Sequence, residues 1–192
     1  LYASVGFGGG STYLALLLIW DVPYKVFPII ALCCNIIVVS GNCFNYARIG
    51  NINIKLLIPY LISSIPLAFI GGSLQLEKNF FEILLFIVLS LAGLSLLLKF
   101  KSFDDTSDIN RNIPKAVSFI IGGSIGFISG VVGIGGGIFL SPILLLIKAG
   151  RAKDIAAAAS IFILINSIAG LFGQSTKGFI FNEIYNYWPL FL

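Results

Sequence analysis

Residues 116–147 read AVSFIIGGSIGFISGVVGIGGGIFLSPILLLI, an apolar stretch that carries the string GIGGG at positions 133–137. Nearly the same string, GFGGG, stands at positions 6–10. Each glycine costs a helix interior roughly 1 kcal/mol relative to alanine, so the four glycines of each string cost about 4 kcal/mol. A simple membrane anchor gains nothing from that penalty. The strings therefore indicate backbone that bends, or that approaches another group closely, at membrane depth.

The composition is that of a membrane protein. Hydrophobic residues make up 58% of the chain and charged residues 10%, with a mean hydropathy of +1.02. A soluble domain carries about 25% charged residues. The net charge of +4 comes from lysines and arginines between the apolar stretches, where such charge sets membrane topology. No basic run with interleaved aromatic residues indicates a nucleic-acid partner, so the bilayer is the first partner expected.

Apolar stretches long enough to cross a bilayer follow one another along the chain. A spanning helix needs about 20 apolar residues. Five stretches qualify as complete, at 26–46, 54–73, 80–98, 116–147 and 155–173. Residues 1–20 read as a truncated sixth stretch, and residues from 185 onward read as the start of another. We therefore expect an all-α, polytopic transmembrane bundle, of which this chain is a fragment in a protein of about eight helices.

The two glycine strings mark an internal repeat with a register of 127 to 128 residues. We expect a first transmembrane repeat at 1–98 with a truncated N-terminus, a polar loop at 99–115, and a second repeat at 116–192 with a truncated C-terminus. The first helix of each repeat is broken at its glycines. Repeats with interrupted apolar segments at matching positions are typical of transporters that bind substrate at the repeat interface.

The stretch 116–147 is too long for one upright crossing. As a helix it would extend roughly 48 Å, against a hydrocarbon core of about 30 Å. It either crosses once as a steeply tilted helix or breaks at the glycines and turns back. A single crossing divides the lysines and arginines five against seven between the two membrane sides, whereas a doubled-back stretch divides them three against nine. The positive-inside rule favours the doubled-back alternative.

The residues after the second glycine string predict where a new helix begins. Ser141 is a good N-cap residue and Pro142 suits the first helical position. A helix that starts within the membrane presents unpaired N–H groups and a positive dipole end, which together attract an anion. In the first half Ser11 follows the glycines, but Ala15 stands where the second half has Pro142. A simple kink, relieved by neighbouring helices, is the alternative.

Polar residues occur within both segments that follow a glycine string. Asn35 lies in 26–46, and Ser160 and Asn166 lie in 155–173. Such side chains in lipid need a polar partner or a water-filled cavity. Hydrogen bonding between helices and contact with a substrate explain them equally well.

The sequence indicates no catalytic chemistry, metal site or cofactor. It holds no histidine, and no acidic or basic residue lies in the middle of a complete span. The three cysteines, Cys33, Cys34 and Cys43, lie in one apolar stretch and are interpreted as packing residues. We therefore do not expect an enzyme.

The paired Gly-x-Gly-Gly-Gly strings, with Ser141-Pro142 and Ala159-Ser160 after the second, resemble the sulfite exporter TauE/SafE family of membrane transporters. The resemblance covers essentially the whole chain. It implies a multi-pass protein of the bacterial inner membrane with about eight helices in two homologous halves. It also implies transport of small anions, notably sulfite, sulfoacetate and related organosulfur compounds. At the matching positions it implies that glycines line the site, with a serine near each helix start: Gly6, Gly8, Gly9, Gly10, Ser11, Gly133, Gly135, Gly136, Gly137 and Ser141.

The function expected is export of a small anion by alternating access at the repeat interface, with Asn35, Asn166 and Ser160 as side-chain donors beside the glycines and Pro142. Two alternatives stay open. One is a membrane scaffold or assembly protein that uses its glycine stripes only for packing. The other is a transporter of a different small carboxylate. The sequence indicates no particular oligomeric state.

Overall fold

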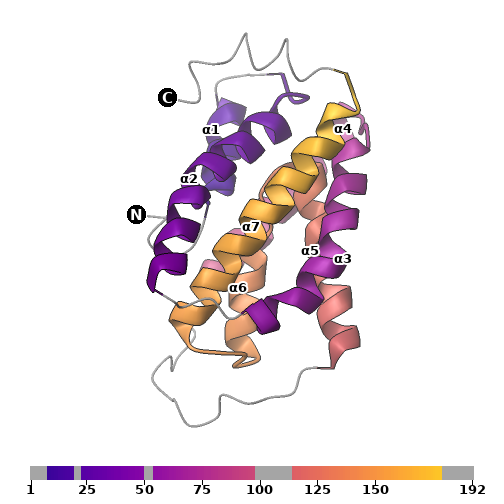
Figure 1. Ribbon diagram of the computed structural model, residues 1–192. Coiled ribbons are helices and arrows are strands. Elements are labelled where there is room, and N and C mark those ends of the chain that lie inside the picture. Colours follow the sequence, from indigo (N-terminus) through magenta and orange to yellow (C-terminus); the bar gives the residue numbers. More distant parts are fainter. Residues whose placement is uncertain (1–7, 20–22, 50–53, 98–113, 179–192) are drawn as a thin grey trace.

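The computed structural model describes residues 8–19, 23–49, 54–97 and 114–178, and within these ranges every regular element is an α-helix (Figure 1). Gly6, most of the polar loop and the apolar segment from residue 185 onward lie outside the described residues. The helices, in chain order, are α1 (Gly10–Ile19), α2 (Phe27–Ile49), α3 (Ile54–Ser73), α4 (Lys78–Leu97), α5 (Lys115–Val132), α6 (Gly137–Leu146) and α7 (Ala152–Ser175).

Four of the described helices are long and apolar enough to cross a membrane. They cover Phe27–Arg48, Leu56–Ser73, Lys115–Val132 and Lys153–Ser175, and α4 occupies the further stretch predicted at 80–98. By contrast, α1 and α6 have only ten residues each. The predicted all-helical character is thus confirmed for the described residues, four of whose helices could each cross a membrane, and the helices that follow the glycine strings are half-length.

The stretch 116–147 is broken at its glycines. Helix α5 ends at Val132, Gly133 caps it with a φ of 90°, and α6 begins after Gly136. Figure 1 shows α6 running back toward the end of the bundle at which α5 begins. The doubled-back alternative is therefore the one that the fold adopts, and it places the connection between α6 and α7 at the same end as the start of α5.

The predicted start of the second short helix was wrong. Helix α6 begins at Gly137 with Gly136 as its N-cap, so Ser141 and Pro142 lie inside it. The reason is that Gly135 and Gly136 adopt φ values of 80° and 78°, which complete the turn five residues earlier than a cap at Ser141 would. Because proline has no backbone N–H, Pro142 cannot donate a hydrogen bond to the carbonyl of the preceding turn, and this short buried helix tolerates the missing bond.

Small residues form the seam at which α5 packs on α3. A Cβ added at Gly122, Gly126 or Gly130 would meet the backbone of α3, at the carbonyls of Tyr60, Ser64 and Ala68 respectively. Such close approach of two backbones is what a small-xxx-small stripe permits. The glycines at 122, 126 and 130, spaced four residues apart, therefore serve to pack α5 on α3. Helix α7 packs on α3 in the same way, with Gly173 against the carbonyl of Phe69.

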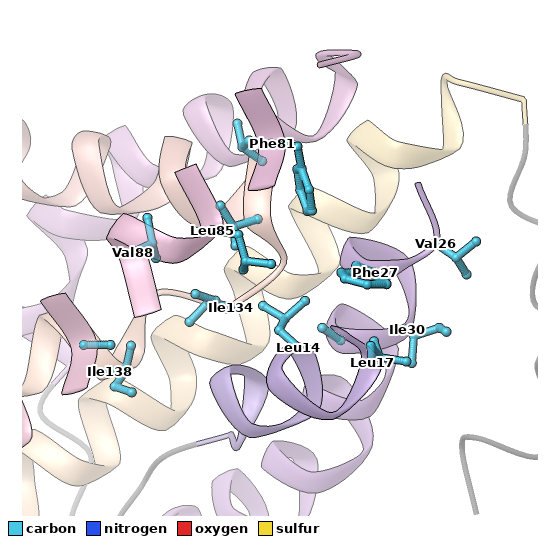
Figure 2. Close-up of a cluster of buried hydrophobic side chains, with 14 residues drawn as sticks. Leu14, Leu17, Val26, Phe27, Ile30, Phe81, Leu85, Val88, Ile134 and Ile138 are labelled. Atoms are coloured by element: carbon cyan, nitrogen blue, oxygen red, sulfur yellow. The ribbon is translucent and has the colours of Figure 1, made fainter. Parts of the chain in front are cut away.

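Apolar side chains hold α1 and α4 against the second glycine turn. Figure 2 shows Leu14 and Leu17 of α1 gathered with Phe27 of α2, Leu85 of α4 and Ile134 of the turn. All of these side chains are at least 96% buried. The cluster therefore fixes the first short helix beside the break between α5 and α6.

The α3–α5 seam predicts a sharp difference between two glycines. We expect Gly126→Ala to destabilise the protein by about 1–3 kcal/mol, because its Cβ would meet backbone and overpacking of a tight contact has that cost. Gly41 on α2 is the matched control, because a Cβ there would meet nothing within 4 Å. Gly41→Ala should leave stability unchanged or raise it by up to about 1 kcal/mol. Denaturant titration of the two variants in detergent would measure their free energies of unfolding. Equal stability of the two would contradict the close contact between α3 and α5.

Candidate functional site

The two glycine turns share one local geometry. Gly9 and Gly136 both have a φ of 78°. The carbonyl of Gly9 accepts hydrogen bonds from the N–H groups of Thr12 and Tyr13 at 3.0 and 3.1 Å. The carbonyl of Gly136 accepts them from Phe139 and Leu140, at the same offsets, at 3.1 and 3.2 Å. Each turn therefore starts a ten-residue helix from a backbone conformation that glycine adopts without strain.

The two turns lie against each other. A Cβ added at Gly10 would stand 2.9 Å from the carbonyl oxygen of Ile134 and 3.1 Å from its Cα. Residues of both turns line one small cavity of about 10 Å³. The lining residues are Gly8, Gly9, Gly10, Ser11, Ile134, Ile138 and Ile163. The N-terminal ends of α1 and α6 thus meet at one place inside the bundle, and the cavity between them has about the volume that a single water needs.

Asn35 of α2 connects the two turns. Its side chain is fully buried, and Nδ2 donates a 3.3 Å hydrogen bond to the carbonyl of Gly133. The same amide stands so close to the first turn that a Cβ at Gly8 would lie 2.6 Å from Oδ1. A Cβ at Gly135 would lie 3.1 Å from Nδ2. The predicted site residues Asn35, Gly8, Gly10, Gly133 and Gly135 are therefore brought together.

The polar residues predicted on α7 are buried, and each bonds to its own helix. Ser160 Oγ donates to the carbonyl of Ala156 at 2.9 Å, and Asn166 Nδ2 donates to the carbonyl of Phe162 at 2.9 Å. Both side chains are fully buried. In this conformation each donates one hydrogen bond to its own helix, and Asn166 keeps a second N–H on the same amide.

Two serines near the second turn were missed as site residues. Ser167 Oγ would stand 3.1 Å from a Cβ at Gly135, and Ser129 Cβ would stand 3.5 Å from one at Gly136. Ser167 lies seven positions after Ser160, so helical periodicity places both on one face of α7. This spacing was the feature of the sequence that could have pointed to Ser167.

Several buried polar atoms around the break are unpaired. Among the residues that the structure describes, six buried side-chain atoms have no hydrogen-bond partner: Asn35 Oδ1, Tyr60 OH, Ser129 Oγ, Ser141 Oγ, Asn166 Oδ1 and Ser167 Oγ. Leaving a buried polar group unpaired costs about 1–3 kcal/mol. Three of these residues, Asn35, Ser129 and Ser167, stand against the second turn, and such unpaired groups are a feature of a site that meets water or a ligand.

The remaining predicted residues pack around the second turn. A Cβ at Gly137 would meet Ile163 of α7, and one at Gly136 would stand 2.7 Å from Ile125 Cγ2. Ser141 and Pro142 are buried in α6. Ser11 is half-buried at the start of α1.

Charge stays away from the two turns. Within the described ranges, the ion pairs are Lys78–Glu82 at 3.7 Å and Arg151–Asp154 at 2.9 Å, and both lie at helix ends. The described residues contain no group of His, Cys, Asp or Glu that could hold a metal ion. A ligand at the turns would thus meet backbone N–H groups, amides and hydroxyls.

Comparison with known proteins identifies the family. The family model described as "Sulfite exporter TauE/SafE" matches residues 1–192. The chain belongs to the TauE/SafE family. The resemblance read from the glycine strings is confirmed.

Two curated relatives of this TauE/SafE chain are named as transporters. "Probable membrane transporter protein y4hK" of Sinorhizobium fredii is 29% identical over 195 residues, which cover 100% of this chain and 76% of the relative. "Probable membrane transporter protein MJ0441" of Methanocaldococcus jannaschii is 34% identical over 157 residues, which cover 79% of this chain and 57% of the relative. No solved structure matches. The family and these names indicate a membrane transporter rather than an enzyme.

Replacing Asn35 should separate function from stability. Asn35→Leu removes an unpaired buried oxygen, which stabilises the fold, and also the hydrogen bond to Gly133, which destabilises it. The net change in the free energy of unfolding should therefore stay within about 2 kcal/mol. We expect this variant to fold and to lose anion flux in liposomes. Asn45→Leu, at an exposed position of the same helix, is the matched control and should keep both properties. If the Asn35 variant kept full flux, Asn35 would not belong to the site.

Proposed function

We propose that this TauE/SafE protein exports small anions, notably sulfite or organosulfur compounds such as sulfonates, through a site between the two glycine turns. The observation that carries the proposal is the meeting of two short-helix N-termini, at Gly9–Gly10 and Gly136–Gly137, around the buried amide of Asn35. Paired half-helix N-termini are a recurrent way to bind anionic groups at the centre of a transporter.

The anion is held by neutral donors. The first N–H groups of a helix have no partner within it, and the helix dipole places partial positive charge there. The hydroxyls of Ser129 and Ser167 add donors beside the second turn, since neither has a partner among the described residues. Asn35 Oδ1 is an acceptor and suits a protonated oxygen, as in bisulfite. A site without a full positive charge binds weakly, and an exporter needs its substrate to leave.

Transport requires the turns to separate. The cavity between them measures about 10 Å³, which is room for one water and too little for a sulfur oxyanion. The described conformation is thus closed at the proposed site. Alternating access would open it first toward one membrane face and then toward the other, as α1 and α2 move relative to α6 and α7.

The charge distribution orients the protein in the cell membrane. One end of the bundle, at the bottom of Figure 1, carries Arg48, Lys115, Lys148, Arg151 and Lys153. The other end carries Lys25, Lys78 and Lys177. The positive-inside rule places the first end in the cytoplasm, in the inner membrane if the cell is a bacterium.

The scaffold alternative is less favoured because the small residues already pack against other helices of the same chain. The stripe at 122, 126 and 130 is covered by α3, and the glycines of the turns face α2, α7 and each other. These glycines are therefore not available to dock a partner helix. A carboxylate substrate remains the second candidate, because neutral N–H donors also bind carboxylates.

Reconstitution of the full-length protein in liposomes tests the proposal. We expect saturable sulfite efflux that sulfoacetate inhibits and sulfate inhibits less. Carboxylate flux in place of sulfite flux would move the function to the second candidate. Absence of flux for every oxyanion and carboxylate, from protein shown to be folded and inserted, would contradict the transport proposal.

The same assay tests the second turn. We expect Gly136→Leu to abolish flux while the protein still inserts, because a side chain at a φ of 78° is strained and its Cβ would meet Ile125 and Phe162. Gly41→Leu is the control, because that position of α2 faces open space. Undiminished flux through the Gly136 variant would exclude this turn from the pathway.

A further inference from the structure

A second, larger pocket opens at the end of the bundle opposite the basic connections. It has a volume of about 290 Å³ and lies where the start of α2, the α3–α4 connection, the end of α5 and the end of α7 meet, at the top of Figure 1. Its inner wall includes Val131 and Gln174, which are buried. Its mouth includes Lys25, Glu77 and Lys177. The pocket therefore leads from solvent toward the end of α5, just before the second glycine turn.

A hydrogen-bonded chain positions Lys177 in this pocket. Its Nζ donates to Gln174 Oε1 at 2.9 Å, and Gln174 Nε2 donates to the carbonyl of Gly130 at 3.3 Å. Gln174 is 1% exposed, so its amide is fixed by the surrounding helices. The ammonium of Lys177 is thereby held against the pocket wall, with a neutral amide oxygen rather than a carboxylate as its partner.

Lysines outnumber carboxylates among the described residues that line the pocket. Two lysines line it, and Glu77 is the one carboxylate among its described lining residues. Half-burial lowers the pKa of Lys177 to about 8, because the charged ammonium loses solvation there. Lys177 is therefore mostly charged at pH 7, and that charge is incompletely solvated. An anion beside it would restore the lost stabilisation.

We propose that this pocket is an outer anion site, in which Lys177 holds a small oxyanion as it passes between the glycine turns and the outer solution. The inference rests on the proposed anion transport, and it adds a charged site to the neutral one at the turns. Gln174 is a positioning residue, because it holds Lys177 in place and bonds to Gly130. A lipid phosphate offers the same chemistry as a free oxyanion, and the test below separates these two sources.

Protection of Lys177 from acylation tests the pocket without requiring transport. The full-length protein in neutral detergent is treated with a limiting amount of an N-hydroxysuccinimide acetate, and modification of each lysine is measured by mass spectrometry. Sulfoacetate is the probe, with sodium chloride at matched ionic strength as the salt control. At about twice its Kd the probe should slow modification of Lys177 about threefold by mass action. Lys78, which lies at the same end but outside the pocket, should be unaffected.

The outcomes separate the two proposals. Equal modification of Lys177 with and without sulfoacetate would overturn the outer site, whether or not the protein transports sulfite. Protection that appears only in vesicles of phosphatidylglycerol, without added anion, would assign the pocket to a lipid headgroup and overturn the proposal. Protection in detergent together with a complete lack of anion flux would uphold the outer site and contradict the export function.

Flux measured from this face gives a second test. We expect Lys177→Gln to raise KM severalfold with little change in kcat, while Lys177→Arg and Lys78→Gln keep the wild-type KM. With sulfoacetate as the transported anion, whose charge does not change near pH 8, the wild-type KM should rise as the pH passes about 8 and Lys177 loses its proton, while the KM of the arginine variant stays constant. Tyr24, Lys25 and Glu77 also face the pocket, and the arginine variant retains them. An identical pH dependence in both proteins would exclude Lys177 from the site.

Discussion

The need to satisfy every backbone polar group away from water governs this structure. Helix α5 stops within the membrane, which frees the carbonyls of its last turn. The carbonyl of Gly130 accepts from Gln174 of α7, and the carbonyl of Gly133 accepts from Asn35 of α2. Two side-chain amides from neighbouring helices thus satisfy two of the carbonyls at the break. Helices α2 and α7 therefore both stabilise the turn that they enclose.

Polar and small residues have different functions in this bundle. The glycines of α5 bring its backbone against that of α3, which gives the break a rigid support. The serines and asparagines around the turns leave oxygen atoms unpaired, at a cost in stability that packing alone does not explain. In the proposed site the serine hydroxyls can donate to an anion, whereas the asparagine oxygens only accept and need water or a protonated oxygen as a partner. The lysines stand apart, at the ends of the bundle.

The sequence predicted the larger features because these follow from simple constraints. A 32-residue apolar stretch cannot cross a bilayer upright, and the lysines flanking it favoured the reversal that the fold adopts. The helix start at Gly137 was missed, because Ser141 and Pro142 match the capping rules while the positive φ values of Gly135 and Gly136 cannot be read from glycine alone. Ser167 and Gln174 were not predicted as site residues, since their contacts depend on which residues of the second turn and of α5 lie opposite them. The repeat of whole halves stays a prediction, although Gly9 and Gly136 share one local geometry.

The central claim is that the first turns of α1 and α6 meet and must separate during transport. A disulfide across the cavity tests it most directly. Ser11→Cys and Ile138→Cys line the same cavity from the two helices, and they would be introduced after Cys33, Cys34 and Cys43 are replaced by alanine. The account predicts that oxidation cross-links the pair within one chain and stops anion flux, and that a reductant restores it. Failure of the pair to cross-link, or full flux through the cross-linked protein, would contradict the account.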